Sequence, residues 1–246
     1  MTLTFEGFTM LGTTVPEPAK SDANRLYVCS AGYQPDLGLV RIYPLGRVGA
    51  PKRWSVSSVT VERNPKDSRR ESWKLAGDRS HENVNSQFRR IGEWSRSDRE
   101  RLLELCSSRK VPTSITEANE RRLSLALVEP DHLDFEIEHN ADSPDSPQLR
   151  LFSDGLPEPL GAKRFPQIPR LVFTSEGTRH RLMLRDWGAY EYMRKNPNRV
   201  SELPSALHLG PRSALLVGNL NHQRNAWVVI SVLNVRIAQL ALGVAV

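Results

Sequence analysis

The sequence has little cysteine, with only Cys29 and Cys106 among 246 residues. Two cysteines cannot build a disulfide framework or a four-cysteine zinc site, and each stands in an apolar stretch typical of a buried thiol. The N-terminal segment also lacks the basic start and continuous apolar stretch of a secretory signal peptide, because Glu6 interrupts its apolar portion. We therefore expect a protein of the reducing cytoplasm.

The sequence also lacks a clean apolar run that could cross a membrane. The longest candidate, residues 227–246, contains Asn234, Arg236 and Gln239 in its middle, and each of these is costly in hydrocarbon. Buried strands explain this run better. We expect no membrane partner.

The signatures of common enzyme classes are absent as well. The sequence contains no glycine-rich phosphate loop, dinucleotide-binding glycine pattern, HExxH zinc motif, nucleophile elbow or CxxC pair. An enzyme is not excluded, because acid, base and nucleophile can come from distant parts of a chain. We expect no cofactor and no metal, and the question of catalysis stays open.

Short apolar runs separated by turn residues dominate the chain and predict many β-strands. Residues 32–38 join two such runs as in a hairpin, and residues 170–184 repeat the pattern. Helices are predicted where a capping residue precedes an apolar face, namely over 97–107, from 114 to about 122, and over 187–195. These patterns predict an α+β fold.

An acidic segment divides the chain. Residues 134–158 hold seven acidic side chains against the single Arg150, and their Ser-Pro repeats disfavour both helix and central strand. We interpret 134–162 as a surface loop or linker. It separates an N-terminal β-rich lobe with a helix, residues 1–133, from a C-terminal β-rich lobe with a helix, residues 163–246.

Positive charge gathers in residues 51–110, which hold fifteen Lys and Arg against nine Asp and Glu and so account for the net charge of +6. Residues 163–185 add six basic side chains against one acidic one. Arginine interleaved with tryptophan is typical of nucleic-acid grooves, because guanidinium groups grip phosphates and aromatic rings stack on bases. The alternative is a solvated surface whose charges pair within the protein. The predicted contact residues are Arg63, Arg69, Arg70, Trp73, Lys74, Arg79, Arg89, Arg90, Arg179 and Arg181.

Four residues are candidates for catalysis: Asp67, Glu71, His180 and Asp186. A histidine that reaches an acidic partner at a strand–helix junction is a reasonable general base. The alternative for Asp186 is the cap of the following helix. A catalytic set of this kind would make the protein a nuclease-like or phosphotransfer enzyme. A third hypothesis is a protein–protein adaptor with a basic face.

Several short motifs, spread over most of the chain, carry a resemblance to other proteins. They are residues 28–32, 39–44 and 67–72, His180 with 186–187, and residues 216–219 and 227–230. On these motifs the chain resembles uncharacterised prokaryotic proteins similar to the dual OB-containing domain group. The resemblance implies two OB-like β-lobes, a fold that often binds oligonucleotides. Some relatives carry a cysteine pair near residues 173–175, where this chain has none. We expect an accessory or sensing module for DNA or RNA, in a defence or mobile-element context.

Overall fold

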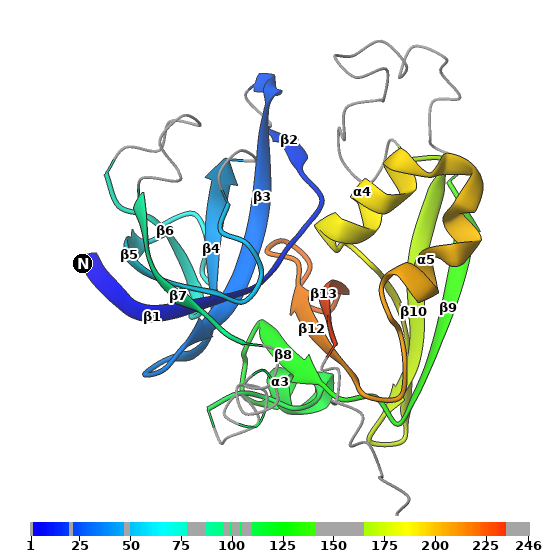
Figure 1. The fold of residues 1–246 in the computed structure, drawn as a ribbon. Helices are drawn as coiled ribbons and strands as arrows, with labels where there is room; N and C mark the ends of the chain where they lie inside the picture. Colours follow the sequence, from blue (N-terminus) through cyan, green and yellow to red (C-terminus); the bar gives the residue numbers. More distant parts are fainter. Residues whose placement is uncertain are drawn as a thin grey trace, which may run out of the picture.

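A computed structural model describes residues 2–19, 22–46, 50–77, 87–95, 110–140 and 165–234, together with positions 99 and 104. The described chain consists mostly of strands with a few short helices, which confirms the β-rich class (Figure 1). Several expected features lie outside the described residues. They are Arg79, Cys106, residues 141–162 of the expected linker, and the helix expected over 97–107 except for positions 99 and 104.

Five strands of the N-terminal half close into a barrel. The strands are β1 (Thr2–Thr13), β3 (Asp22–Gln34), β4 (Gly38–Gly46), β5 (Ser55–Arg63) and β6 (Ser72–Leu75). β1, β3 and β4 pair in antiparallel succession, β6 lies parallel to β4 and antiparallel to β5, and β5 pairs back to β1. A closed five-stranded barrel with one parallel pair is OB-like.

Two further strands extend this barrel. β2 (Glu17–Ala19) pairs with β3, and β7 (Phe88–Glu93) pairs with β5 beyond the end of β6. The barrel interior holds alternate residues of its strands, among them Phe5, Ile42 and Trp73. Burying each such side chain stabilises the fold by about 1.5–3 kcal/mol.

The turn between β3 and β4 is the hairpin expected from residues 32–38. The Gln34 side-chain oxygen accepts hydrogen bonds from the backbone of Asp36 and Leu37 at 2.7 and 2.8 Å, which fixes the turn. Gly38 follows with φ 80°, and a Cβ there would lie 3.1 Å from the carbonyl oxygen of Lys110. Glycine therefore lets residue 110 approach the end of the hairpin.

The C-terminal half contains two three-stranded sheets. One has the order β11-β10-β9, and the other has the order β13-β12-β8. The strands are β8 (Leu125–Val128), β9 (His132–His139), β10 (Gln167–Ser175), β11 (Thr178–Met183), β12 (Ser213–Asn219) and β13 (Trp227–Asn234). A parallel bridge between Leu184 and Val229 links the end of β11 to β13.

β9 corrects the expected start of the linker. Residues 134–139 were expected in a loop that begins at 134, but they belong to a strand that pairs with β10 along its length. Leu133, Phe135 and Ile137 pack against the core, while the acidic residues between them alternate to the other face. The alternation of apolar and acidic residues therefore decides that this segment is a strand, despite its acidic composition.

Short helices complete the C-terminal half and confirm two of the predicted caps. They are α3 (Ile115–Glu120), α4 (Trp187–Lys195), the 3-10 helix η3 (Pro197–Glu202) and α5 (Leu203–Ala206). The Ser114 hydroxyl accepts from the Glu117 amide at 3.1 Å, and Asp186 caps α4. No helix in the described part of the chain is long and apolar enough to cross a membrane.

The two halves pack through a shared apolar layer. β8, β12 and β13 lie between the barrel and the sheet of β9 and β10 (Figure 1). Leu11, Ala31 and Leu39 of the barrel join Leu216 and Ile230 in one buried cluster. The C-terminal half therefore covers part of the outer surface of the barrel.

Candidate nucleic-acid interface

The loop between β5 and β6, residues 64–71, contains a buried ion pair. The Arg69 guanidinium donates from Nε and Nη2 to the Asp67 carboxylate, at 2.9 and 2.5 Å, and the Ser72 hydroxyl donates to the same carboxylate at 2.6 Å. Burial alone raises the pKa of Asp67, but the hydrogen bonds from Arg69 and Ser72 outweigh it and lower the pKa to about 2. Asp67 is therefore a charged structural group at neutral pH.

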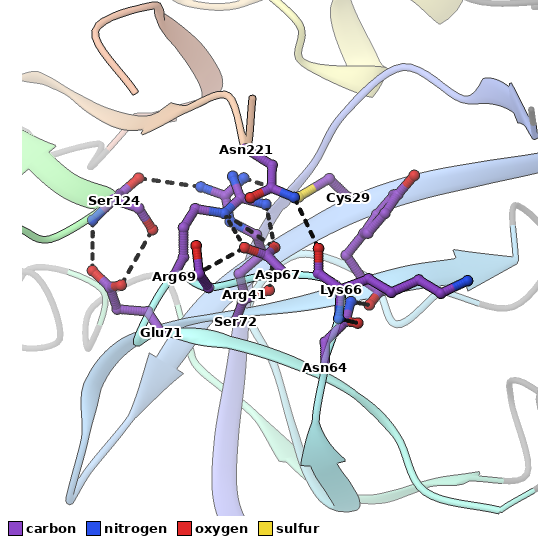
Figure 2. Close-up of polar contacts among 12 residues, drawn as sticks. Cys29, Arg41, Asn64, Lys66, Asp67, Arg69, Glu71, Ser72, Ser124 and Asn221 are labelled. Carbon is purple, nitrogen blue, oxygen red and sulfur yellow. Dashed lines mark hydrogen bonds and ion pairs between the residues drawn. The ribbon is translucent and has the colours of Figure 1, made fainter. Parts of the chain in front are cut away.

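The same loop fastens the barrel to the C-terminal half (Figure 2). Arg69 donates to the carbonyl oxygen of Asn219 at 2.7 Å, and Glu71 accepts from the Ser124 amide at 2.6 Å. Arg41 of β4 is buried and donates to the Ser124 carbonyl at 3.1 Å. Arg69 and Glu71 were candidates for nucleic-acid contact and catalysis, and the structure places both in this internal junction.

Beside the loop lies a groove with a volume of about 410 Å³. Three of the predicted contact residues, Arg63, Arg70 and Trp73, line it together with Lys110 and Arg121. The remaining lining residues are Asp36, Leu37, Leu39, Val40, Glu71 and Leu123. We call this feature the basic groove. Its cations come from the end of β5, from the loop 64–71 and from both sides of α3.

Neighbouring groups hold three of the four cations of the basic groove in place. The Arg63 guanidinium lies 3.8 Å from the centre of the Trp73 ring and donates to the carbonyl oxygen of Arg70. Lys110 donates to the Asp36 carbonyl at 3.3 Å, and Arg121 pairs with Glu117 at 2.8 Å. Arg70 is exposed, and no group in the described part of the chain hydrogen-bonds to its guanidinium.

Trp73 has a different role from the expected one. Its side chain is 2% exposed, and the Arg63 guanidinium covers one face of the ring. A base therefore cannot stack on Trp73. Guanidinium planes can also stack on bases, and Arg63 is exposed.

Three other predicted basic contacts lie outside the lining of the basic groove and are paired with acids. The Lys74 ammonium lies 2.7 Å from the Glu62 carboxylate. On β7, Arg89 pairs with Glu6. Arg90 pairs with Glu93. Exposed pairs of this kind contribute little to stability. Lys74, Arg89 and Arg90 therefore do not extend the basic groove.

On the C-terminal sheet, Arg179 and Arg181 share one face of β11. The register places Arg179 opposite Thr174 and Arg181 opposite Val172, with His180 on the other face. Arg181 donates to Glu138 at 2.8 Å. Hydrogen bonds from Arg170 and Arg181 lower the pKa of Glu138 to about 2.

The four catalytic candidates are not brought together. The ring of His180 packs 5.1 Å from the ring of Phe173, and burial lowers the pKa of His180. The Asp186 carboxylate is fully buried and accepts from Arg53 at 2.6 Å and from Ser231 at 2.9 Å while it caps α4. Asp67 and Glu71 hold the partners given above. Among the described residues, no group of three or more His, Cys, Asp and Glu side chains could hold a metal ion.

Sequence reasoning missed two cations of the basic groove, Lys110 and Arg121. Both are remote in sequence from Arg63 and Arg70 and flank a helix that was predicted only from its cap. The Gly38 turn and the barrel bring these segments together only in the folded protein. No local sequence pattern therefore links them.

A family model described as a domain of unknown function (DUF8758) matches residues 7–104. The matched span takes in most of β1 and the strands from β2 to β7, and it stops before α3. No curated protein matches the sequence. Among solved structures, the crystal structure of the tetrameric p202 HIN2 is similar with a TM-score of 0.31 and 7% identity, over 93% of this chain and 89% of that one. None of these matches names the dual OB-containing domain group, so that resemblance stays a prediction.

Proposed function

We propose that the protein binds nucleic acid through the basic groove, as an accessory or sensing module. One observation carries the proposal: Arg63, Arg70, Lys110 and Arg121 converge from separate segments on one groove of an OB-like barrel. The groove adjoins the loop between β5 and β6, the fourth and fifth strands of the barrel. OB-folds use this loop to hold oligonucleotides.

The chemistry of the groove suits a phosphate backbone. Guanidinium groups give two parallel hydrogen bonds to phosphate, and the ammonium of Lys110 adds a point charge. The lining holds four cations against two acids, Asp36 and Glu71, which leaves the cations in excess. Contacts of Arg63 with Trp73 and of Lys110 with backbone carbonyls hold these side chains in position before a ligand arrives, so less side-chain entropy is lost on binding.

We infer that the C-terminal half is a second OB-like lobe. In this interpretation β8 and β9 together form its first strand, broken at residues 129–131, and β10 and β11 follow. α4 lies between the third and fourth strands, and the parallel Leu184–Val229 bridge corresponds to the parallel β4–β6 pair. The boundary between lobes then lies between β7 and β8 rather than at residue 133, and a defence or mobile-element setting stays part of the proposal.

The proposal is tested by fluorescence anisotropy with labelled single- and double-stranded DNA and RNA oligomers at two salt concentrations. Arg70→Ala should weaken binding to all sequences and lower the slope of log affinity against log salt by about 1, because one phosphate contact is lost. Arg212→Ala is the matched control, since it removes an equal charge from an exposed loop outside the groove.

Three other outcomes of these measurements would contradict the proposal. If no oligomer binds at low salt, nucleic-acid binding is wrong. If gels of the same samples show cleavage, the nuclease alternative replaces a binding module. If Arg212→Ala weakens binding as much as Arg70→Ala, net charge rather than the basic groove accounts for the affinity.

A further inference from the structure

The outer face of β3 and β4 is covered at one end and open at the other. Tyr33 and Leu39, near the turn between the two strands, belong to the cluster buried under the C-terminal half. At the far end, the side chain of Tyr43 is 39% exposed and Tyr27 is half-buried. Tyr43 is one of three large hydrophobic side chains that are exposed in the described part of the chain.

Strand alternation and contacts place the two tyrosines on the same face. Ile42 points into the barrel core, so Arg41 and Tyr43 point outward. Arg41 donates to the Cys29 sulfur at 3.5 Å, which places Cys29, and with it Tyr27 two residues earlier, on that outward face. Burial raises the pKa of Tyr43, and the neighbouring Cys29 and Tyr27 raise it further. Both side chains therefore lie on the same outward face of the barrel.

Cationic side chains border this surface because two loops meet there. Asn64 donates to the Tyr43 carbonyl at 3.3 Å and thereby places the loop 64–71 beside the tyrosines. Asn221 donates to the Lys66 carbonyl at 3.2 Å (Figure 2), and Arg224 donates to the Ser68 hydroxyl at 2.7 Å. Lys66 and Arg224 are both exposed.

We propose that Tyr27 and Tyr43 form a base-stacking platform, with Lys66 and Arg224 binding the adjacent phosphates, and that the ligand is therefore single-stranded nucleic acid. The inference rests on the proposed function and names its substrate class. Unpaired bases stack on aromatic rings, whereas the bases of a duplex are already stacked on one another. The platform and the basic groove both adjoin the loop 64–71, the first through Asn64 and the second through Arg70, so one strand can contact both.

The test compares wild-type protein with Tyr43→Ala, Tyr43→Phe and the control Ile91→Ala, which removes an exposed apolar side chain from β7. The probes are a labelled single-stranded 20-mer, the same 20-mer with abasic sites, and a duplex. Tyr43→Ala should weaken binding of the normal single strand roughly 5- to 100-fold, as expected for loss of one stacked base. Tyr43→Phe and Ile91→Ala should bind as wild type does. Tyr43→Ala should leave the salt dependence unchanged, because the ring carries no charge.

Binding to the abasic probe and to the duplex can contradict the proposal that the tyrosines stack on bases. If the abasic strand binds wild-type protein as tightly as the normal strand, or if Tyr43→Ala weakens duplex and single strand equally, stacking is wrong. If Arg70→Ala weakens binding while Tyr43→Ala does not, the platform fails and the basic groove stands. If wild-type protein binds no oligomer, both proposals fail.

A second measurement uses wild-type protein and so does not depend on the folding of a variant. A single-stranded oligomer with 5-bromouracil is irradiated in complex with the protein, and the crosslinked peptide is identified by mass spectrometry. Crosslinks at Tyr43 or Tyr27 support the platform. Crosslinks confined to peptides without these tyrosines overturn it.

Discussion

At the scale of single residues, three arginines in eight consecutive positions have three different environments. Arg69 is buried against Asp67, Arg63 lies on the Trp73 ring, and Arg70 is exposed. Their side-chain chemistry is the same, so the burial of each position decides what it does. A buried guanidinium that holds a carboxylate cannot reach a phosphate in solvent, whereas an exposed one can present its donors to it.

The buried Asp67–Arg69 pair leads to a prediction about stability. Asp67→Asn leaves a buried guanidinium without its counter-charge and should lower the free energy of unfolding by about 3 kcal/mol. Denaturant unfolding at pH 7 measures the change. Asp36→Asn, in an exposed turn, is the control and should change the free energy by less than about 0.5 kcal/mol.

The same pair predicts how stability depends on pH. The pKa of Asp67 is about 2 in the folded protein and about 3.9 in an unfolded chain. Because the folded value is the lower one, the carboxylate stabilises the protein above about pH 4, and this contribution is lost as the pH falls toward 2. The difference in stability between wild type and Asp67→Asn should therefore shrink over that range. A constant difference would show that charge is not the cause.

At the scale of secondary-structure elements, Asp186 joins the start of α4 to the barrel. Its carboxylate caps the helix, accepts from Ser231 of β13, and pairs with Arg53 just before β5. Asp186→Ala should lower the free energy of unfolding by about 3 kcal/mol, since it leaves these groups unpaired. Asp134→Ala breaks only an exposed contact with His132 and should cost less than about 1 kcal/mol. If Asp186→Ala keeps the wild-type free energy of unfolding, the structural role of Asp186 is contradicted.

The elements also show what the sequence could predict. The caps Ser114 and Asp186 were predicted correctly because a cap and its amide are within three residues of each other. β9 was missed, since seven acids and repeated prolines suggested a loop while its apolar residues still alternated. Arg63 and Arg70 were predicted as contact residues from composition, and both line the basic groove, but their contact with nucleic acid stays a prediction. Whether a particular arginine pairs internally depends on tertiary contacts, which no local pattern encodes.

At the scale of the whole molecule, the barrel and the C-terminal half share one buried apolar cluster and a set of polar contacts. Loop 64–71 takes part in both this junction and the two surfaces proposed to bind nucleic acid. We therefore expect the position of the halves and the shape of the binding surface to be coupled, so that a change at the apolar cluster also changes binding.

Gly12 of β1 tests this coupling. A Cβ at residue 12 would lie 2.4 Å from the Cβ of Ser231, whereas a Cβ at Gly92 on β7 would meet nothing within 4 Å. Gly12→Ala should therefore push β1 and β13 apart and lower the free energy of unfolding by about 1–3 kcal/mol, or the melting temperature by several degrees. Gly92→Ala should leave stability unchanged or slightly raised. Melting curves measured with and without the single-stranded oligomer check both variants. If Gly12→Ala loses stability but keeps wild-type affinity, the halves are packed together without being coupled in binding.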